Sequence, residues 1–197
     1  IEDTILNFAY KKREIVYLPK TKIKFNKLSN IILVACGTAY HSCMIAKYWL
    51  EEMTDFNVSI DIASEYRYRK SKIDKNSIGI VVSQSGETMD TLKCLNKFKK
   101  NNINTISIVN VLNSSIARLS DFILPTLAGP EIGVASTKAF TSQLSVLALF
   151  VLNLQQECST INKTFFNSIF DIHNYVEEIL KKENEFKKIA KALVNTK

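Results

Sequence analysis

The sequence predicts an α/β fold: a three-layer α/β/α sandwich around a five-stranded parallel sheet, followed by C-terminal helices. Short β-branched runs alternate with segments of helical spacing, which is typical of a parallel sheet covered on both sides. The first run, residues 31–35, is apolar at every position, as expected for a strand buried on both faces. The five predicted strands span residues 31–35, 58–63, 78–82, 105–109 and 122–124.

The segment before the first strand, residues 1–30, is interpreted as a lead-in. Residues 1–10 have helical character, and Pro19 with the Lys/Asn-rich stretch after it marks a boundary. The chain begins with Ile1 rather than Met and shows no signal-peptide pattern. We therefore expect it to be a piece of a longer cytoplasmic protein.

Helical spacing between the strands predicts the crossover connections of one domain, residues 31–155. Longer helices are expected over residues 40–53 and 89–100. Shorter helical segments are expected over residues 64–70 and 114–118. Right-handed crossovers would then place helices on both faces of the sheet.

The pattern changes after the fifth strand. A loop over residues 128–138 holds two of the five glycines of the chain and leads into an apolar helix, residues 138–154. Residues 156–197 form a helical extension, with amphipathic helices predicted over 165–180 and 184–194. The apolar stripes of these helices need a partner surface, which the sheet domain or a second chain could supply.

Composition and charge exclude several classes of function. The hydrophobic content of 46% is ordinary for a globular protein, and no apolar run approaches the ~18–20 residues that span a bilayer. The net charge of +7 arises mainly in residues 1–30, which carry seven Lys/Arg and three Asp/Glu. No basic face with interleaved aromatic residues is visible, so we expect neither a nucleic-acid nor a membrane partner.

The cysteines and histidines predict neither a disulfide framework nor a metal site. The four cysteines, Cys36, Cys43, Cys94 and Cys158, have no short paired spacing, and the chain contains only two histidines. We interpret the cysteines as reduced, mostly buried thiols. No metal and no cofactor is predicted.

One motif organises the rest of the chain: Ser83-Gln84-Ser85-Gly86-Glu87-Thr88, between the strand 78–82 and the helix 89–100. The free N–H groups of such a turn and the dipole of the following helix can stabilise a phosphate without Lys or Arg. The hydroxyls of Ser83, Ser85 and Thr88 and the amide of Gln84 add neutral donors. The alternative is that Ser85 or Thr88 only caps the helix, with Glu87 as a first-turn acid.

A second hydroxyl-bearing turn follows the first strand. Gly37 and Thr38 come directly after residues 31–36, and Thr38 is either a ligand-facing residue or simply a helix cap. In a parallel sheet, ligands gather at the carboxyl ends of the strands, near the point where the connections diverge. We therefore expect this turn and the Ser83–Thr88 turn to open onto one crevice.

Four further residues are candidates for a role in the site. Cys36 has no charged base beside it in sequence, so we interpret it as a buried thiol rather than a nucleophile. Glu87 could be a general base but is more simply a partner of the helix dipole. Lys138, at a helix start where cations are disfavoured, could meet an anionic ligand or a carboxylate. For His41 the sequence does not decide between surface and site.

Taken together, these segments resemble the isomerase region of the glutamine–fructose-6-phosphate aminotransferases, or glucosamine-6-phosphate synthases. This region is built from sugar isomerase (SIS) domains, which have a flavodoxin-like fold. The Ser83–Thr88 motif is shared by many phosphosugar-binding domains, whereas the Glu131–Lys138 loop is specific to these synthases. The resemblance runs through residues 35–38, 62–70, 83–88 and 128–140, in order.

The resemblance implies a set of site residues. Ser83, Gln84, Ser85 and Thr88 would hold the phosphate of a hexose 6-phosphate. Thr38 would contact the phosphosugar, Val134 and Ser136 would line the sugar pocket, and Gly37, Glu87 and Lys138 would lie nearby. One departure is Ala39, where the family usually has Ser. The missing hydroxyl would cost about 0.5–1.5 kcal/mol of binding.

The resemblance also implies what this chain would do. It would be the first half of an isomerase region that binds fructose 6-phosphate and glucosamine 6-phosphate during glutamine-dependent synthesis of the amino sugar. The glutaminase domain and the second SIS domain, which carries the acid–base residues, are absent, so we assign no catalytic residue and expect binding without turnover. Family members dimerise through this region.

The alternative function is a stand-alone phosphosugar-sensing regulatory module. A nucleotide-binding protein is disfavoured by the absence of Gly-x-Gly-x-x-Gly and Walker motifs.

Overall fold

The fold is built on a five-stranded parallel sheet, as predicted. The structure is a computed structural model that describes residues 1–132, 136–158, 160–194 and 196. The strand order is β4-β3-β5-β6-β7, and every neighbouring pair is parallel. The strands are β3 (Asn30–Ala35), β4 (Asn57–Ile62), β5 (Ser77–Ser83), β6 (Asn104–Val109) and β7 (Phe122–Pro125).

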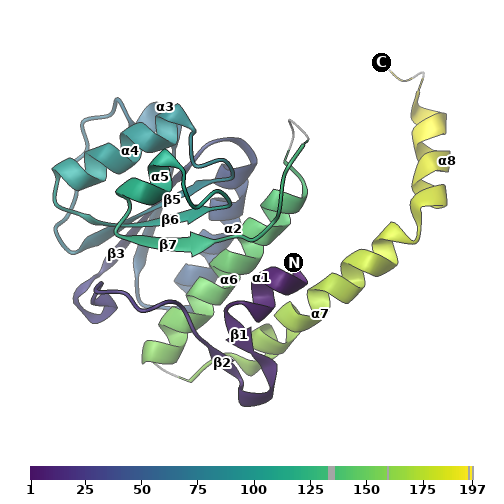
Figure 1. The fold of residues 1–197 in the computed structure, drawn as a ribbon, viewed down its shortest axis with the longest axis horizontal. Helices are drawn as coiled ribbons and strands as arrows, with labels where there is room; N and C mark the ends of the chain where they lie inside the picture. The colour runs from purple at the N-terminus through teal and green to yellow at the C-terminus, as the bar shows by residue number, and fades with distance from the viewer. Residues whose placement is uncertain (133–135, 159, 195, 197) are drawn as a thin grey trace.

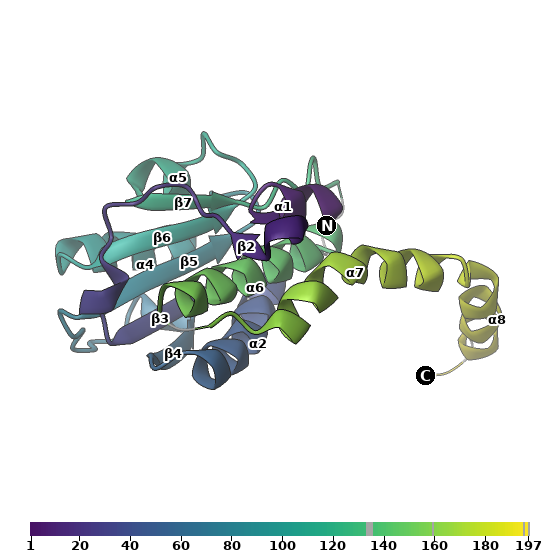
Figure 2. The same cartoon turned by 90° about the horizontal axis from the view of Figure 1, so that it is seen from below.

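Helices cover both faces of the sheet (Figures 1 and 2). Residues of β3 and β5 alternate between two apolar clusters: Leu33 and Ile80 contribute to one, and Val34 and Val81 to the other. Because both faces are apolar, the central strands are buried at nearly every position, which confirms the three-layer sandwich. The covering helices are α2 (Gly37–Met53) and α6 (Lys138–Cys158) on the first face, and α3 (Ala63–Tyr66), α4 (Met89–Lys100) and α5 (Ser115–Leu119) on the second.

The connections diverge between β3 and β5. These two strands are direct neighbours, with Ala35 paired to Val82. The chain leaves β3 into α2 on one face of the sheet and leaves β5 into α4 on the other. A crevice at the carboxyl ends of these two strands is the expected consequence of that topology.

The N-terminal residues pack against the first face of the sheet domain. The helix predicted over residues 1–10 is wrong in length: α1 spans Glu2–Leu6, and the chain then forms a short hairpin of β1 (Ala9–Tyr10) and β2 (Ile15–Val16). Ile5, Phe8 and Val16 are buried in the same apolar cluster as α6. The Thr4 hydroxyl donates to the Thr126 carbonyl at 2.7 Å, which ties α1 to the end of β7. Two short 3₁₀ turns, Lys11–Arg13 and Phe25–Lys27, complete this segment.

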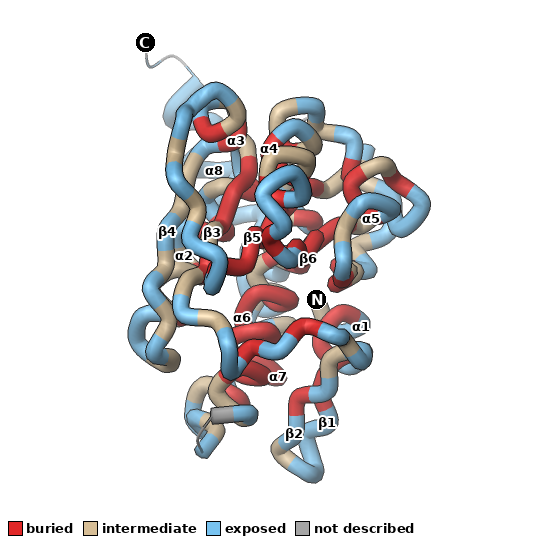
Figure 3. Tube along the Cα trace, turned by 90° about the vertical axis from the view of Figure 1, so that its left-hand side faces the viewer, coloured by how far each residue is buried: buried red, intermediate tan, exposed pale blue. Residues whose placement is uncertain are grey.

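The two C-terminal helices extend progressively away from the sheet. In α7 (Lys163–Leu180), the cap residue Asn162 accepts from the Phe165 N–H at 3.0 Å, and Phe166, Ile169 and Phe170 are buried. The second half of α7 is exposed, including Tyr175. No residue of α8 (Glu183–Leu193) is buried (Figure 3). This helix projects from the rest of the chain (Figure 2). The predicted C-terminal helices are therefore confirmed.

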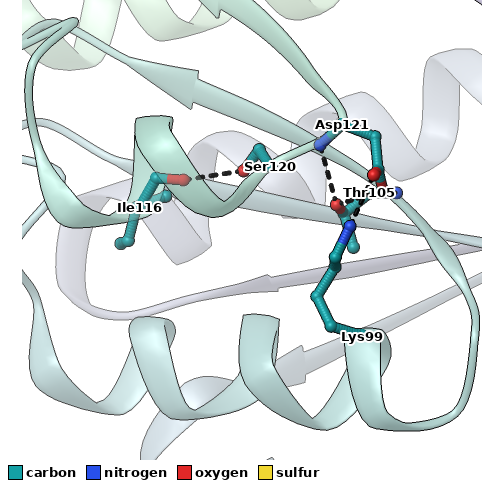
Figure 4. A network of polar contacts seen from close by, with 5 residues as sticks. All are labelled: Lys99, Thr105, Ile116, Ser120 and Asp121. Carbon is teal, nitrogen blue, oxygen red and sulfur yellow. Dashed lines mark hydrogen bonds and ion pairs between the residues drawn. The ribbon is translucent and has the colours of Figure 1, made fainter.

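A polar network lies at the amino ends of β6 and β7, the end of the sheet opposite the crevice (Figure 4). The Asp121 carboxylate accepts from the N–H and the hydroxyl of Thr105, both at 2.8 Å, and pairs with Lys99. Partial burial raises the pKa of Asp121, but the bonds from Lys99 and Thr105 outweigh it, so the net pKa is lowered. Nearby, the Ser120 hydroxyl donates to the Ile116 carbonyl at 2.8 Å. The network joins α4, β6 and the start of β7.

Candidate functional site

A cavity of about 190 Å³ lies at the carboxyl ends of β3 and β5. A larger hollow of about 630 Å³ lies at the far end of α2, around Glu51–Phe56, away from the ends of the strands where ligands bind in this topology. The described residues that line the smaller cavity come from both turns, the loop before α6 and α6 itself. They are Cys36, Thr38, Ala39, Val82, Ser83, Gln84, Ser85, Thr88, Glu131, Ser136 and Gln143.

The Ser83–Thr88 turn is organised by its own hydroxyl groups. The Ser83 and Thr88 hydroxyl oxygens lie 2.9 Å apart, and the Gly86 N–H donates to the Ser83 hydroxyl at 3.1 Å. The Ser85 hydroxyl accepts from the Glu87 N–H at 3.2 Å. These bonds fold the turn tightly at the end of β5, with Ser83 itself almost fully buried.

The alternative that the hydroxyl of Ser85 or Thr88 merely caps α4 is wrong, because neither side chain makes a capping bond to this helix. Thr88 occupies the cap position, but its side chain makes no capping bond, and Ser85 bonds within the turn instead. Uncapped helices keep first-turn N–H groups without an intrahelical acceptor. The start of α4 therefore retains backbone donors beside the cavity that Thr88 lines.

The turn is held against the start of α5. Gly86 has a φ of +67°, and a Cβ added there would lie 1.9 Å from the Ser114 Oγ. The Gly86 carbonyl accepts from the Ile116 N–H at 3.0 Å. The Glu87 carboxylate accepts from the Ser115 N–H at 2.7 Å. The bonds from the Ser115 backbone and side chain, helped by the charge of Arg118, lower the pKa of Glu87.

Glu87 is therefore placed differently from both expectations. It precedes α4 rather than lying in its first turn, and its carboxylate stabilises the start of α5. It is not among the described residues that line the cavity. A role as general base has no support in this arrangement.

Asn110, which the sequence reasoning missed, joins the Ser83–Thr88 turn to the loop after β7. Its backbone N–H donates to the Gln84 carbonyl at 3.1 Å. Its side-chain oxygen accepts from the Ala128 N–H at 2.8 Å and the Thr126 hydroxyl at 3.1 Å, while its Nδ2 donates to the Gly129 carbonyl at 2.8 Å. The backbone and the side chain of Asn110 together tie the Ser83–Thr88 turn to the loop after β7.

The second turn belongs to the helix itself. The predicted start of this helix at Tyr40 is wrong: α2 begins at Gly37, which has a φ of +59°, and the cap position is Cys36. Thr38 is consequently a first-turn residue rather than the cap, and it lines the cavity together with Ala39. Because Cys36 makes no capping bond, the first-turn N–H groups of α2 are also left without a side-chain acceptor.

The loop before α6 supplies the opposite wall. Ser136 lines the cavity, and its buried hydroxyl has no hydrogen-bond partner among the described residues. Val134 lies outside the described residues. The Glu131 carboxylate accepts from the Ala139 N–H at 3.1 Å and so caps α6. Lys138 is exposed and makes no ion pair within the described residues, so it meets no carboxylate there, and contact with an anionic ligand stays a prediction. Neither Lys138 nor Gly37 is among the described lining residues.

Gln143 lines the cavity and was also missed by the sequence reasoning. It lies in α6, where apolar residues dominate, and only 1% of it is exposed. Its Oε1 has no hydrogen-bond partner among the described residues. The available signal was a polar side chain near the start of a largely apolar helix, but Thr141, Ser142 and Ser145 beside it are polar too, so Gln143 is not distinctive.

The chemistry of the cavity is that of a neutral anion site. Hydroxyls, an amide and two uncapped helix starts converge there, and the described lining contains neither Lys nor Arg. The one charged lining residue among those described is Glu131, which is engaged at α6. His41 is exposed. Burial raises the pKa of Cys43 and Cys94 to about 12, so these thiols are inert. The described residues contain no cluster of three or more potential metal ligands.

Comparisons with known proteins agree with this geometry. A family model of the SIS domain matches residues 24–153. The isomerizing glutamine–fructose-6-phosphate aminotransferase of Bartonella quintana is 42% identical over 90% of this chain and 30% of its own length. The enzyme of the same name from Bradyrhizobium diazoefficiens is 40% identical over 98% of this chain and 33% of its own length. This chain thus spans about a third of these relatives.

A solved structure is similar over nearly the whole chain. The C-terminal domain of the glucosamine–fructose-6-phosphate aminotransferase from Francisella tularensis superposes with a TM-score of 0.91 at 40% identity, covering 98% of this chain and 56% of that domain. In the described part of the chain, none of the helices has both the length and the apolar character to span a membrane.

Proposed function

The chain belongs to the SIS domain family, and we propose that its cavity binds the phosphate end of a hexose 6-phosphate, such as fructose 6-phosphate or glucosamine 6-phosphate. One observation supports this above all others. Four neutral side-chain donors and the uncapped starts of α2 and α4 meet around a single cavity. Such donors suit a phosphate group, whose oxygens are acceptors, and need no cation to do so.

In this proposal the two turns have distinct roles. Ser83, Gln84, Ser85 and Thr88 hold the phosphate from the side of α4, and Thr38 contacts it from the side of α2. Ala39 supplies no hydroxyl, which weakens binding by about 0.5–1.5 kcal/mol relative to a serine at that position. Ser136 lines the sugar portion.

The proposal extends to the longer protein that the relatives suggest. We propose that this chain supplies the phosphosugar site of the first half of an isomerase region, within a glutamine-dependent, isomerizing aminotransferase. A ketose–aldose shift needs an acid–base group near the reacting carbons. Among the described lining residues, Glu131 is committed to the Ala139 N–H and no histidine is present. The chain alone is therefore expected to bind without turnover, and α7 and α8 to face the rest of the protein or a second copy.

Calorimetric titration of the 197-residue chain tests the proposal. We expect heats of binding with fructose 6-phosphate and glucosamine 6-phosphate, and much weaker binding of ATP, whose nucleotide has no matching motif in the sequence. Absence of binding by both sugar phosphates would refute the proposed site. Formation of glucosamine 6-phosphate by this chain alone would refute the claim that it lacks the catalytic groups.

A further inference from the structure

Two of the described residues that line the cavity, at or near the start of α6, carry buried polar atoms without a hydrogen-bond partner. The Oε1 of Gln143 and the Oγ of Ser136 are buried without a hydrogen-bond partner among the described residues, and both residues line the cavity. The three other buried orphan atoms in the described chain belong to Thr91, Ser107 and His173, none of which lines it. Among the described residues, unpartnered buried atoms and cavity lining therefore occur together only around the start of α6.

An unpartnered buried amide oxygen is costly unless something supplies a donor. Leaving such an acceptor unsatisfied carries its full desolvation penalty, which is larger than the net gain of an ordinary hydrogen bond. Gln143 is 1% exposed, so bulk water does not offset this cost. A ligand in the cavity that Gln143 lines can supply such a donor.

The chemistry of the amide oxygen decides which part of a ligand it meets. A phosphate dianion offers only acceptors and would be repelled by a carbonyl oxygen, whereas a sugar hydroxyl can donate to it. The phosphate-type donors of the cavity lie instead in the Ser83–Thr88 turn and in the first turn of α2. The two walls are thus complementary to the two ends of a phosphosugar.

We propose that Gln143 is a specificity-determining residue whose Oε1 accepts a hydrogen bond from a hydroxyl of the bound sugar. The inference rests on the proposed function, since it requires a sugar phosphate in this cavity. It goes beyond that function by assigning discrimination between a phosphosugar and a bare phosphate to one side chain of α6. The neutral amide distinguishes the hydroxyl-bearing end of the ligand without opposing the charge of its other end.

Substitution of Gln143 by Met tests the assignment, because Met has a similar volume but no strong acceptor. We expect Gln143→Met to weaken binding of fructose 6-phosphate by about three- to tenfold, the value of one hydrogen bond. Binding of inorganic phosphate should change by less than about twofold. The melting temperature should not fall, because the variant removes an unsatisfied buried acceptor rather than a bond.

Ser107→Ala is the matched control. It also removes a buried, unpartnered polar atom, but from β6 and away from the cavity. We expect its affinities for fructose 6-phosphate and for inorganic phosphate to equal those of the unsubstituted chain. Gln143→Leu serves as a second variant if the Gln143→Met protein does not fold correctly. We expect the same binding pattern from it.

The outcomes separate the two hypotheses. If the unsubstituted chain binds no sugar phosphate, the proposed function fails and this inference fails with it. If it binds fructose 6-phosphate and Gln143→Met binds equally well, only the role of Gln143 is refuted. If both Gln143 variants lose fructose 6-phosphate and inorganic phosphate together, or fail to fold, the residue is structural and the specificity role is refuted.

Discussion

The two walls of the cavity differ in how their polar groups are satisfied. In the Ser83–Thr88 turn, the hydroxyls bond to one another and to neighbouring N–H groups. At the start of α6, the Ser136 hydroxyl and the Gln143 amide oxygen have no partner among the described residues. The first wall is therefore organised before any ligand arrives, whereas the second carries groups whose partners are still to be supplied.

This difference suggests a division of labour. A preorganised turn can hold a phosphate without spending binding energy on rearranging its own donors. Orphaned groups at α6 give no stability by themselves and gain a partner only when a ligand of the right chemistry is present. Changes to the turn should consequently lower stability, while changes at Gln143 should alter selectivity alone.

The largest expected effect comes from Gly86→Ala in the turn. The new Cβ would lie 1.9 Å from the Ser114 Oγ, and the backbone has a φ of +67°. We expect the left-handed conformation and the steric clash to lower the free energy of unfolding by about 2–5 kcal/mol, measured by chemical denaturation. Because the turn must shift, affinity for fructose 6-phosphate should fall by about tenfold or more.

Gly129→Ala is the control for this variant. Gly129 has a nearly identical φ of +68°, but a Cβ added there meets nothing within 4 Å. Its cost should be the backbone strain alone, about 1–2 kcal/mol. Equal destabilisation by the two variants would show that contact between the turn and Ser114 contributes nothing to the organisation of this wall.

A smaller effect is expected from Ser83→Ala. The change removes the acceptor of the buried Gly86 N–H and the partner of the Thr88 hydroxyl. Leaving these groups unsatisfied should lower the free energy of unfolding by about 1–3 kcal/mol, measured by denaturant titration. Gln143→Met, which removes no bond, is the comparison variant. If Ser83→Ala and Gln143→Met lowered the free energy of unfolding equally, the proposed difference between the two walls would be contradicted.

The contrast also explains which parts of the site could be predicted from the sequence. The Ser83–Thr88 turn is contiguous, and its hydroxyls lie between a recognisable strand and a recognisable helix, so local pattern was sufficient. The meeting of this turn with Thr38 followed from the topology of a parallel sheet. The five strands could be predicted because their apolar runs are separated by clear turns and helical spacing.

The residues that were missed depend on contacts across the fold. Gln143 lies in a mostly polar stretch at the start of α6, residues 141–145, and only the packing of α6 beside the two strand ends reveals that it lines the cavity. Asn110 lies just beyond β6, a position at the carboxyl edge that the topology could have highlighted, but its bonds to residues 126–129 could not be foreseen. The start of α2 was misplaced because Cys36 is an unusual cap residue.

The start of α6 is stabilised by a group that the position of Lys138 alone did not indicate. A cation at a helix start suggested a nearby anion. In the structure, the Glu131 carboxylate instead satisfies the backbone of that helix at the Ala139 N–H, and Lys138 is exposed. The helix end is therefore stabilised by a residue seven positions earlier in the chain, which local pattern does not indicate.

The smallest expected effect concerns Glu87, which links the preorganised turn to α5. The bonds from Ser115 lower the pKa of this carboxyl below its usual value of 4.5. A carboxyl with a lowered folded-state pKa adds stability that is present above the unfolded pKa and is lost as the pH falls through the folded pKa. We therefore expect Glu87→Gln to lower the melting temperature slightly at pH 7, and this difference from the unsubstituted chain to shrink on acidification to about pH 3.

Glu52→Gln is the control, because Glu52 is an exposed carboxylate of α2 without an ion pair among the described residues. It should leave the pH dependence of the melting temperature unchanged. A pH dependence of Glu87→Gln identical to that of the unsubstituted chain would mean that the carboxylate adds nothing at the start of α5. In that case the rigidity of this wall would rest on the hydroxyl bonds of Ser83 and Thr88 and on the fit of Gly86 against Ser114.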